Sequence, residues 1–389
     1  MKKKPYISRA VKIACFLLVL LLSVAFLQGY ALRRLDHHTS RFKGYYRLPE
    51  GTVDVALIGA SEVYTGFSSA HAYDAFGFTS YPYASESITA EGTLLALKEI
   101  VRTQKPKLVV IEPNAYLYKK DKNERHDAHI HKLVDNVPLS GNKLDYIRRN
   151  ATGDEAYEYV FPLIKYHGMW TEYPKQGKKV LNSIEQDIRD AFYLKGFRTT
   201  IGKFLPSEKV LNDKLPAETK TEKLNPNYEK KLRELLDYCR SQQLNVVFMR
   251  TPHLVIKDTY GRFKRSCRAA EIVAEYGYDY LNLERDWETT GIDLHTDFYN
   301  YDHLNIYGTM KFTDCVCKIL QTKYNIGRHV FSDGQDAVKT DWDTSASYFN
   351  KLYRYCDEQL QKIKEPTPIQ EDPLRFDEDV ETFRKIEQY

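Results

Sequence analysis

The segment Val53-Asp54-Val55-Ala56-Leu57-Ile58-Gly59-Ala60-Ser61 indicates the class of fold, because a short apolar run leads directly to glycine, alanine and serine. An apolar run with little polar alternation is typical of a strand that is buried on both faces, as in a parallel sheet. Ser61 then stands at the turn from a strand into a helix. In open α/β sheets, ligands and catalytic groups collect at the carboxyl ends of the strands.

The same pattern of short buried runs and helical stretches continues along the chain. The predicted strands are Val53–Ile58, Thr79–Ala84, Lys107–Ile111, Asn245–Met249 and Tyr278–Leu283. Apolar residues at helical spacing predict the helices Thr89–Thr103, Tyr228–Gln242, Arg262–Tyr276 and Asn305–Lys323. Alternation of this kind predicts an α/β domain over residues 51–325, with a five-stranded parallel sheet and helices on both faces.

A long insertion and a C-terminal extension interrupt or follow this pattern. Residues 115–226 exceed any simple αβ connection, so we expect an inserted lid subdomain. Its aromatic residues either form the lid's own core or offer a stacking surface for sugar rings; they are Tyr157, Tyr159, Phe161, Tyr166, Trp170, Tyr173, Phe192 and Tyr193. Residues 326–389 form an extension, in which we expect one helix over Ser345–Lys364 and a solvated acidic end.

The N-terminus has the pattern of a membrane anchor. A basic head, residues 1–12, precedes the apolar run Ile13–Leu32, which has about the length needed to cross a bilayer. Positive charge before the run favours a cytoplasmic head and an extracytoplasmic body from residue 35 onward. The alternative is a cleaved signal peptide with Gly29 and Ala31 at the cut site. Residues 35–50 are predicted to be a linker.

Charge and cysteine content exclude several classes of protein. The five basic residues of the head account for more than the whole net charge of +4, so the near-neutral body does not indicate a nucleic-acid groove. Six cysteines, one of them in the apolar run, form no disulfide framework, and none has zinc-ligand spacing. His126, His129 and His131 lie among polar residues, and we expect a solvated loop there rather than a metal site.

Two segments carry the residues for nucleophilic chemistry. Ser61 follows the first strand, and Asp302-His303-Leu304-Asn305 stands at the start of the last helix, on the same edge of the predicted sheet. A serine hydroxyl becomes a useful nucleophile when a neighbouring imidazole accepts its proton and a third group orients the imidazole. The alternative for Ser61 alone is an ordinary helix N-cap.

Gly59-Ala60-Ser61 and Asp302-His303-Leu304-Asn305 resemble the SGNH/GDSL hydrolase superfamily, over about residues 50–115 and 227–325. The resemblance is closest to its membrane-anchored bacterial branch, which includes the partner protein for D-alanylation of teichoic acids and the alginate O-acetylation proteins. The segments Phe161–His167 and Lys195-Gly196 are also similar to uncharacterised members. The resemblance implies a flavodoxin-like three-layer α/β/α fold and O-acyl ester chemistry, with no metal or organic cofactor.

The sequence departs from the superfamily pattern in three blocks. Ala60 stands where the namesake motif has Asp, and Ala84, Ser85 or Glu86 occupies the place of the oxyanion glycine. The resemblance makes Ser85 and Asn114 candidate oxyanion donors.

The third departure concerns the group that orients His303. The acid expected three residues before His303 is replaced by Asn300, while Asp302 is adjacent to the histidine and Asp297 is six residues before it. We therefore predict Asp302 as the orienting group, with Asn300 as the alternative.

These features predict a membrane-anchored serine esterase or acyltransferase that acts on an acylated envelope glycan or teichoic-type polymer. Ser61, His303 and Asp302 would be its catalytic residues, and a multi-spanning membrane O-acyltransferase is an expected partner. A non-catalytic polymer-binding accessory protein on the same fold is the alternative. A membrane-bound lipase is a third class, which would require an apolar acyl groove.

Overall fold

The computed structural model of the chain describes residues 9–32, 38–121, 127–168, 194–204, 206, 209–212, 214, 220–364 and 380–389. Its centre is a five-stranded, all-parallel sheet with the strand order β2-β1-β3-β4-β5. The strands are β1 (Val55–Gly59), β2 (Ser80–Ala84), β3 (Leu108–Ile111), β4 (Val246–Arg250) and β5 (Asp279–Asn282). The predicted number, order along the chain and parallel direction of the strands are confirmed.

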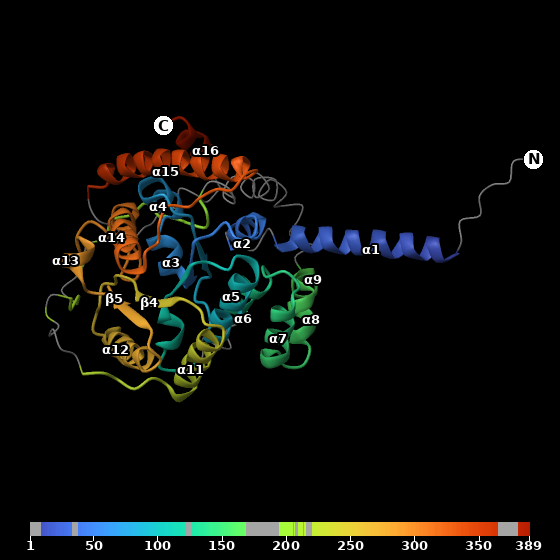
Figure 1. The fold of residues 1–389 in the computed structure, drawn as a ribbon, viewed down its shortest axis with the longest axis horizontal. Helices are drawn as coiled ribbons and strands as arrows, with labels where there is room; N and C mark the ends of the chain where they lie inside the picture. Colours follow the sequence, from blue (N-terminus) through green and yellow to red (C-terminus); the bar gives the residue numbers. More distant parts are fainter. Residues whose placement is uncertain are drawn as a thin grey trace, which may run out of the picture.

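Helices pack against both faces of the sheet (Figure 1). Alternate side chains of β1 point in opposite directions, so Ala56 and Ile58 belong to one apolar cluster and Val55 and Leu57 to the other. The first cluster includes residues of α5 (Ala90–Thr103), α11 (Pro226–Ser241) and α12 (Tyr260–Glu275). The second includes residues of α3 (Ser61–Gly66), α4 (Ser69–Phe76) and α14 (Ile306–Tyr324).

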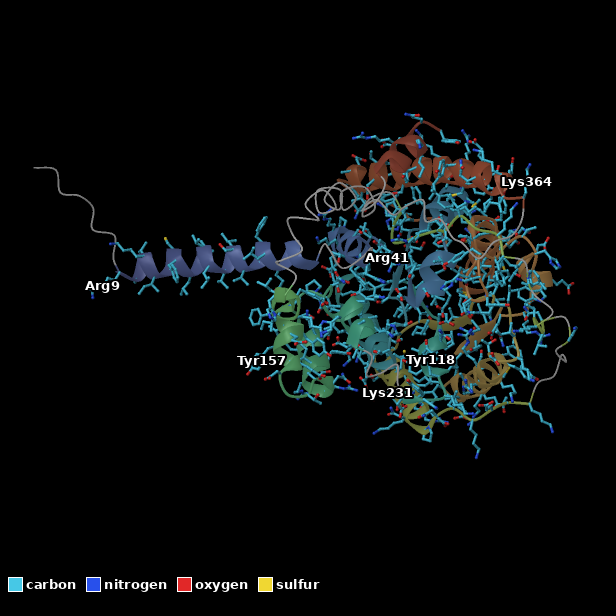
Figure 2. The ribbon with its side chains drawn as sticks, turned by 180° about the vertical axis from the view of Figure 1, so that it is seen from behind. Arg9, Arg41, Tyr118, Tyr157, Lys231 and Lys364 are labelled. Carbon is cyan, nitrogen blue, oxygen red and sulfur yellow. The ribbon has the colours of Figure 1, made fainter. Side chains whose placement is uncertain are left out.

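An apolar N-terminal helix projects away from this body. The helix α1 (Arg9–Leu32) contains a 20-residue segment that is long and apolar enough to cross a membrane, and none of that segment is buried. Figure 2 shows Arg9 at the far end of α1 and Arg41 within the body. Residues 1–8 of the predicted basic head lie outside the described residues.

The predicted linker is wrong for most of its length. Residues 38–47 form the helix α2 (His38–Arg47), and most of its side chains are buried. Phe42 and Tyr45 pack edge-on against Tyr83 of β2, with ring centroids 4.9 and 4.6 Å apart. The Arg41 guanidinium lies over the Tyr64 ring, 3.6 Å from its centroid. The segment is polar in sequence, but it forms a helix that packs against the body through these aromatic and cation–π contacts.

The first part of the insertion, up to residue 166, is largely helical, and its helices α6 and α7 pack beside α5, whereas the described residues between 194 and 225 contain no helix. It contains η1 (Pro113–Tyr116), α6 (Asp127–Val134), α7 (Gly141–Asn150), α8 (Glu155–Val160) and α9 (Pro162–Tyr166). Of its aromatic residues, Tyr159 is buried whereas Tyr157 and Phe161 are exposed. Trp170, Tyr173, Phe192 and Tyr193 lie outside the described residues, as does His126.

The histidine-containing segment does not form the expected solvated loop. His129 and His131 lie on α6, and His131 is only 3% exposed. Its imidazole packs against Tyr159 with ring centroids 5.0 Å apart. The prediction of a solvated loop is therefore wrong for the described residues of this segment.

The C-terminal extension is anchored to the body by a long helix. The helix α15 (Asp336–Lys362) begins earlier than the predicted Ser345 and packs against α4. A short helix, α16 (Val380–Glu387), follows it near the C-terminus, and another short helix, α13 (Trp287–Thr290), precedes the extension. The fully buried Lys195 forms an ion pair with Asp341 and lies 5.1 Å from the Trp342 ring centroid. Residues 365–379, most of the predicted acidic end, lie outside the described residues.

Candidate active site

Ser61 is the first residue of α3 and directly follows the carboxyl end of β1. The turn is tight because a Cβ atom on Gly59 would lie 2.4 Å from Val63 Cγ2 and 2.7 Å from Glu112 Cβ. Only glycine fits where the strand, the first turn of α3 and the end of β3 approach one another this closely. The sequence thus fixes Ser61 at the carboxyl edge of the sheet.

His303 contacts Ser61 although the two residues are 242 positions apart in the sequence. Its Nε2 lies 2.7 Å from Ser61 Oγ, and its Nδ1 lies 2.9 Å from Asn300 Oδ1. Because the amide oxygen of Asn300 accepts only, we assign the Nδ1–H tautomer, which leaves Nε2 free to accept the Ser61 proton. The predicted contact between Ser61 and His303 is present, and the alternative orienting residue, Asn300, completes a Ser-His-Asn arrangement.

The loop before α14 holds His303 in place through several independent contacts. The Tyr299 ring stacks on the imidazole at 5.4 Å between centroids, and Asn300 Oδ1 also accepts the Asp302 N–H at 2.9 Å. Asn305 caps α14 by accepting from Tyr307 N and Gly308 N, and its Nδ2 donates to Thr296 O. Asn305 of the final motif therefore has a structural role in the loop.

Asp302 does not occupy the predicted position beside the imidazole. Its carboxylate forms an ion pair with Arg262 of α12. Among the described residues, the side-chain hydrogen bond that His303 Nδ1 donates goes to Asn300 Oδ1 and not to Asp302. Burial by itself raises the pKa of Asp302, but the charges of Arg262 and His253 outweigh it and hold the pKa well below its usual range. The prediction of Asp302 as the orienting group is therefore wrong, because the loop turns the Asp302 side chain away from the imidazole.

The electrostatics keep His303 neutral. Burial lowers the pKa of the imidazole, which the negative charge of Glu62 and Asp302 only partly offsets. A neutral imidazole with an accepting Nε2 is the form that can act as a general base at neutral pH.

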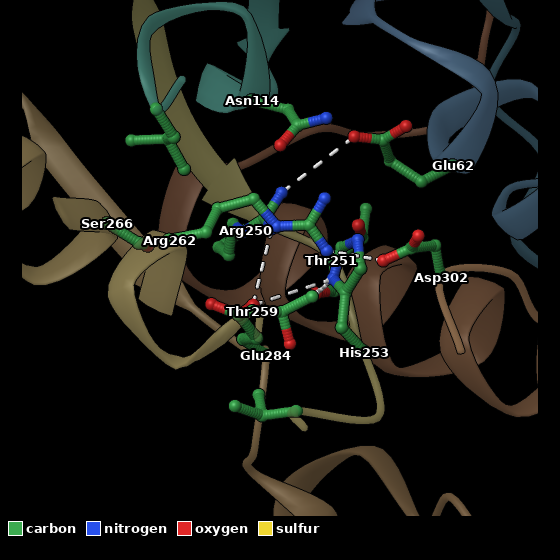
Figure 3. A network of polar contacts seen from close by, with 12 residues as sticks. Glu62, Asn114, Arg250, Thr251, His253, Thr259, Arg262, Ser266, Glu284 and Asp302 are labelled. Carbon is green, nitrogen blue, oxygen red and sulfur yellow. Dashed lines mark hydrogen bonds and ion pairs between the residues drawn. The ribbon is translucent and has the colours of Figure 1, made fainter. Parts of the chain in front are cut away.

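Figure 3 shows a network of charged side chains that includes Glu62, the neighbour of Ser61, and Asp302, the neighbour of His303. Arg250, at the end of β4, is fully buried and forms ion pairs with Glu112 and with Glu284, whose Oε1 lies 3.2 Å from its Nη2. Glu62, the neighbour of Ser61, has Oε1 3.8 Å from Arg250 Nη1. One guanidinium thus faces three carboxyl groups. Burial, together with the charge of Glu62, raises the pKa of Glu112 to about 8.

The two candidate oxyanion donors lie at the same edge of the sheet. The backbone N–H of Ser85 donates to Gly59 O at 3.1 Å, so this amide is engaged in extending the sheet. The Ser85 hydroxyl and the Asn114 Oδ1 are both buried, and neither has a hydrogen-bond partner in the described part of the chain. The first-turn amides of α3 have no partner within the helix, as at any helix start. A developing negative charge near Ser61 can accept from these amides and from the Ser85 hydroxyl, whereas Asn114 can donate only through its Nδ2, because its Oδ1 is an acceptor.

Sequence reasoning missed the residues of the charge network. Glu112 and Arg250 stand at the ends of β3 and β4, where strand-end polar residues could have been noted, but Glu284 and Arg262 follow no recognisable spacing. Asn300 was identified only as an alternative. Among the described residues, one group of His, Cys, Asp or Glu side chains is spaced so that it could hold a metal ion. It lies on α6 and α8, far in the sequence from Ser61 and His303.

A scan against protein-family models finds no match for this chain, and a search of curated proteins also finds none.

Proposed function

We propose that this chain is a membrane-anchored serine O-acyl esterase or acyltransferase that acts on an acylated envelope glycan or teichoic-type polymer. The observation that carries the proposal is the Ser61–His303–Asn300 chain of hydrogen bonds at the carboxyl edge of a parallel sheet. The strand order β2-β1-β3-β4-β5 is that of flavodoxin-like folds, which supports the finer three-layer architecture. A lid formed by residues 115–226 belongs to the same proposal.

The chemistry follows from the roles of the three side chains. Ser61 Oγ attacks the ester carbonyl carbon while His303 Nε2 takes its proton, and the carbonyl electrons move to the oxygen. Collapse of the tetrahedral intermediate expels the alcohol, which receives the proton from His303 and leaves an acyl group on Ser61. Water or a sugar hydroxyl then attacks this acyl-enzyme with the same proton path in reverse. The first acceptor gives hydrolysis and the second gives transfer.

The surroundings of the site support this direction of proton transfer. The lowered pKa of His303 keeps its base form populated at neutral pH. Asn300 fixes the tautomer without supplying the negative charge that a carboxylate would give to the imidazolium. We therefore expect slower turnover than in sites with an acid at that position.

The orientation of the membrane anchor determines on which side of the membrane the serine site meets its substrate. The apolar α1 and the basic residues before it favour a cytoplasmic head and an extracytoplasmic body. A serine site on a membrane-anchored chain suits an acylated envelope polymer, and a multi-spanning membrane O-acyltransferase is the proposed partner. Neither nucleic acid nor an organic cofactor enters this mechanism.

The alternative is a non-catalytic polymer-binding accessory protein on the same fold. The specific observation in its favour is the neutral Asn300 where a catalytic carboxylate is more usual. The two functions differ in whether Ser61 reacts.

Covalent labelling with a serine-directed fluorophosphonate tests the proposal. The full chain in detergent micelles should be labelled once, at Ser61, and Ser61→Ala should abolish the label and the hydrolysis of a small acyl ester. Ser69→Ala is a matched control, because Ser69 is also the first residue of a helix and its hydroxyl has no hydrogen-bond partner among the described residues. An unlabelled Ser61, in a folded chain that still binds envelope polymer, would favour the accessory function.

A further inference from the structure

A second cluster of reactive side chains lies on the inserted helices and has no part in the serine chemistry. His131 and Asp127 of α6 and Glu158 of α8 bring one imidazole nitrogen and two carboxylate oxygens within 4.8 Å of one another. The His131 side chain is only 4% exposed, whereas Asp127 and Glu158 are 59% and 29% exposed. The cluster is therefore buried at the histidine and open to solvent at the carboxylates.

The environment of His131 fixes which nitrogen faces the cluster. Its Nδ1 lies 2.9 and 3.0 Å from the two carboxylate oxygens of Asp135, whose side chain is completely buried. Asp135 accepts a further hydrogen bond from Tyr166 at 2.9 Å. A carboxylate that accepts from one ring nitrogen leaves the lone pair on the other nitrogen, which is the arrangement of histidines that bind metals.

The nitrogen that faces the carboxylates is buried and has no hydrogen-bond partner among the residues that the structure describes. Nε2 lies 3.3 Å from Asp127 Oδ1 and 3.8 Å from Glu158 Oε2. Charged N–H···O pairs are shorter, about 2.7–2.9 Å. Two atoms that bind one tetrahedral zinc ion at about 2.0–2.1 Å each are separated by about 3.3–3.4 Å. The distance to Asp127 therefore matches that of two ligands on one ion, while the Glu158 carboxylate has to approach slightly, and both distances exceed those of direct ion pairing.

Lys165 of α9 supplies the positive charge next to the cluster. Its Nζ lies 2.7 Å from Asp127 Oδ2 and 3.5 Å from Glu158 Oε2. Lys165 thus uses the Asp127 oxygen that does not face His131. With a neutral imidazole, the two carboxylates retain a net negative charge beside this single ammonium, and a divalent cation would neutralise it.

We propose that His131, Asp127 and Glu158 form a binding site for a zinc-class divalent cation, with Asp135 as the residue that orients His131. An imidazole nitrogen and two carboxylates suit zinc better than calcium, which prefers oxygen ligands only. Water completes the coordination on the exposed side. The ion joins α6 to α8 and so stabilises the inserted helices. This inference is independent of the function proposed for Ser61.

Zinc binding to the full chain in detergent micelles tests the site. After removal of metal with a chelator, titration with Zn²⁺ should show one equivalent bound per chain, with a rise in the melting temperature. Glu158→Gln and Asp127→Asn should each abolish this equivalent. Asp135→Asn, which keeps an acceptor but loses the charge, should weaken binding by about 10- to 100-fold. Lys165→Met should strengthen binding, because it removes a positive charge beside the ion.

Glu234→Gln serves as the matched control, because Glu234 pairs with Arg149 on the surface much as Glu158 pairs with Lys165. It should leave the affinity for zinc unchanged, and circular dichroism should show that every variant is folded. Equal binding by wild type and Glu158→Gln would overturn the proposal, as would the absence of bound zinc. Thiolate charge-transfer bands after loading with Co²⁺ would instead assign the metal to cysteine and also overturn it. Labelling of Ser61 reports separately on the serine site.

Discussion

At the scale of single residues, His303 is held by a neutral amide, while the nearby carboxylate is committed elsewhere. Asn300 Oδ1 bonds both His303 Nδ1 and the Asp302 backbone N–H, so one side chain fixes the ring and the loop together. Asp302 pairs with Arg262 instead and influences the imidazole only through its charge. Orientation and charge, which one aspartate usually supplies together, come here from two different residues.

Substitution of these two residues separates their roles. Asn300→Ala should lower the ester turnover number by as much as about 10⁴-fold, the scale known for loss of an orienting group, because the imidazole loses its tautomer. Asn300→Asp should raise turnover, because a carboxylate there also stabilises the imidazolium. Asp302→Asn should have a much smaller effect. Steady-state hydrolysis of a small acyl ester measures all three, and a collapse of activity in Asp302→Asn alone would contradict the assignment.

Glu112 provides a test of the buried charge network. Because its pKa is raised to about 8 in the folded chain, the folded state binds more protons than the unfolded state between the ordinary glutamate pKa and about pH 8. Its contribution to stability is therefore present at low pH and is lost as the pH rises, with a slope of up to about 1.4 kcal/mol per pH unit.

Urea unfolding of wild type and Glu112→Gln at pH 5 and pH 8 measures this contribution. The variant should gain stability relative to wild type as the pH rises, since glutamine cannot ionise. A difference between the two proteins that does not change with pH would show that Glu112 is already ionised in the folded state.

At the scale of elements, the site depends on two places, at the starts of α3 and α14, where segments of the chain approach each other closely. Gly59 lets β1 turn into α3 against Glu112, and Gly308 lets α14 begin against Asp297, where a Cβ atom would lie 2.5 Å from the Asp297 carbonyl oxygen. A Cβ atom on Gly59 would clash with the Val63 and Glu112 side chains, and one on Gly308 would clash with the Asp297 backbone, so a side chain at either position forces the elements apart. The distance from Ser61 to His303 is thus set by these two turns.

Gly59→Ala tests this dependence. The added methyl group should destabilise the chain by about 1–3 kcal/mol and should slow fluorophosphonate labelling of Ser61 by moving the start of α3. Gly141→Ala is the control, because nothing lies within 4 Å of its Cβ position at the start of α7. Denaturant unfolding and labelling rates measure both effects. If Gly59→Ala matched the control in both measurements, the tight turn would not position Ser61.

The sequence predicts the parts of the fold that depend on local periodicity. Each predicted strand and each of the four predicted core helices overlaps an observed one. Strands β1 to β4 are buried as their apolar runs indicate, whereas the edge strand β5 is exposed or half-buried. The helix α2 was missed because His38, Arg41 and Lys43 look like solvated residues, although aromatic packing buries the helix. The start of α15 was placed too late.

The sequence alone predicts the two principal residues of the candidate site, but it predicts the other residues of the site less well. Ser61 and His303 follow from strand ends and topology alone. The choice between Asn300 and Asp302 depends on the shape of a short loop, which periodicity does not describe. The network around Arg250 joins three distant segments, so no spacing within the sequence could reveal it.

At the scale of the whole molecule, α1 extends from the body beside the inserted helices (Figure 1). It contacts α9, whose N-cap residue Phe161 and whose Ile164 are 47% and 46% exposed. Tyr157 of the neighbouring α8 is also exposed and lies on the same side of the body as the anchor (Figure 2). If α1 spans a bilayer, these apolar side chains lie close to the membrane surface, where aromatic residues are favoured.

The orientation of the anchor is the last prediction, and it decides where the serine site works. Lys2, Lys3 and Lys4 precede the apolar helix, so the head should remain in the cytoplasm and the body should be exported. Protease added to intact spheroplasts should digest the body and leave a tag at the N-terminus protected. Replacement of the three lysines by glutamate should reduce the fraction with this orientation, because the charge bias that sets it is removed. A body that stays protected until the spheroplasts are lysed would place Ser61 in the cytoplasm, away from any envelope polymer, and would exclude the proposed substrate even if Ser61 reacts with the fluorophosphonate.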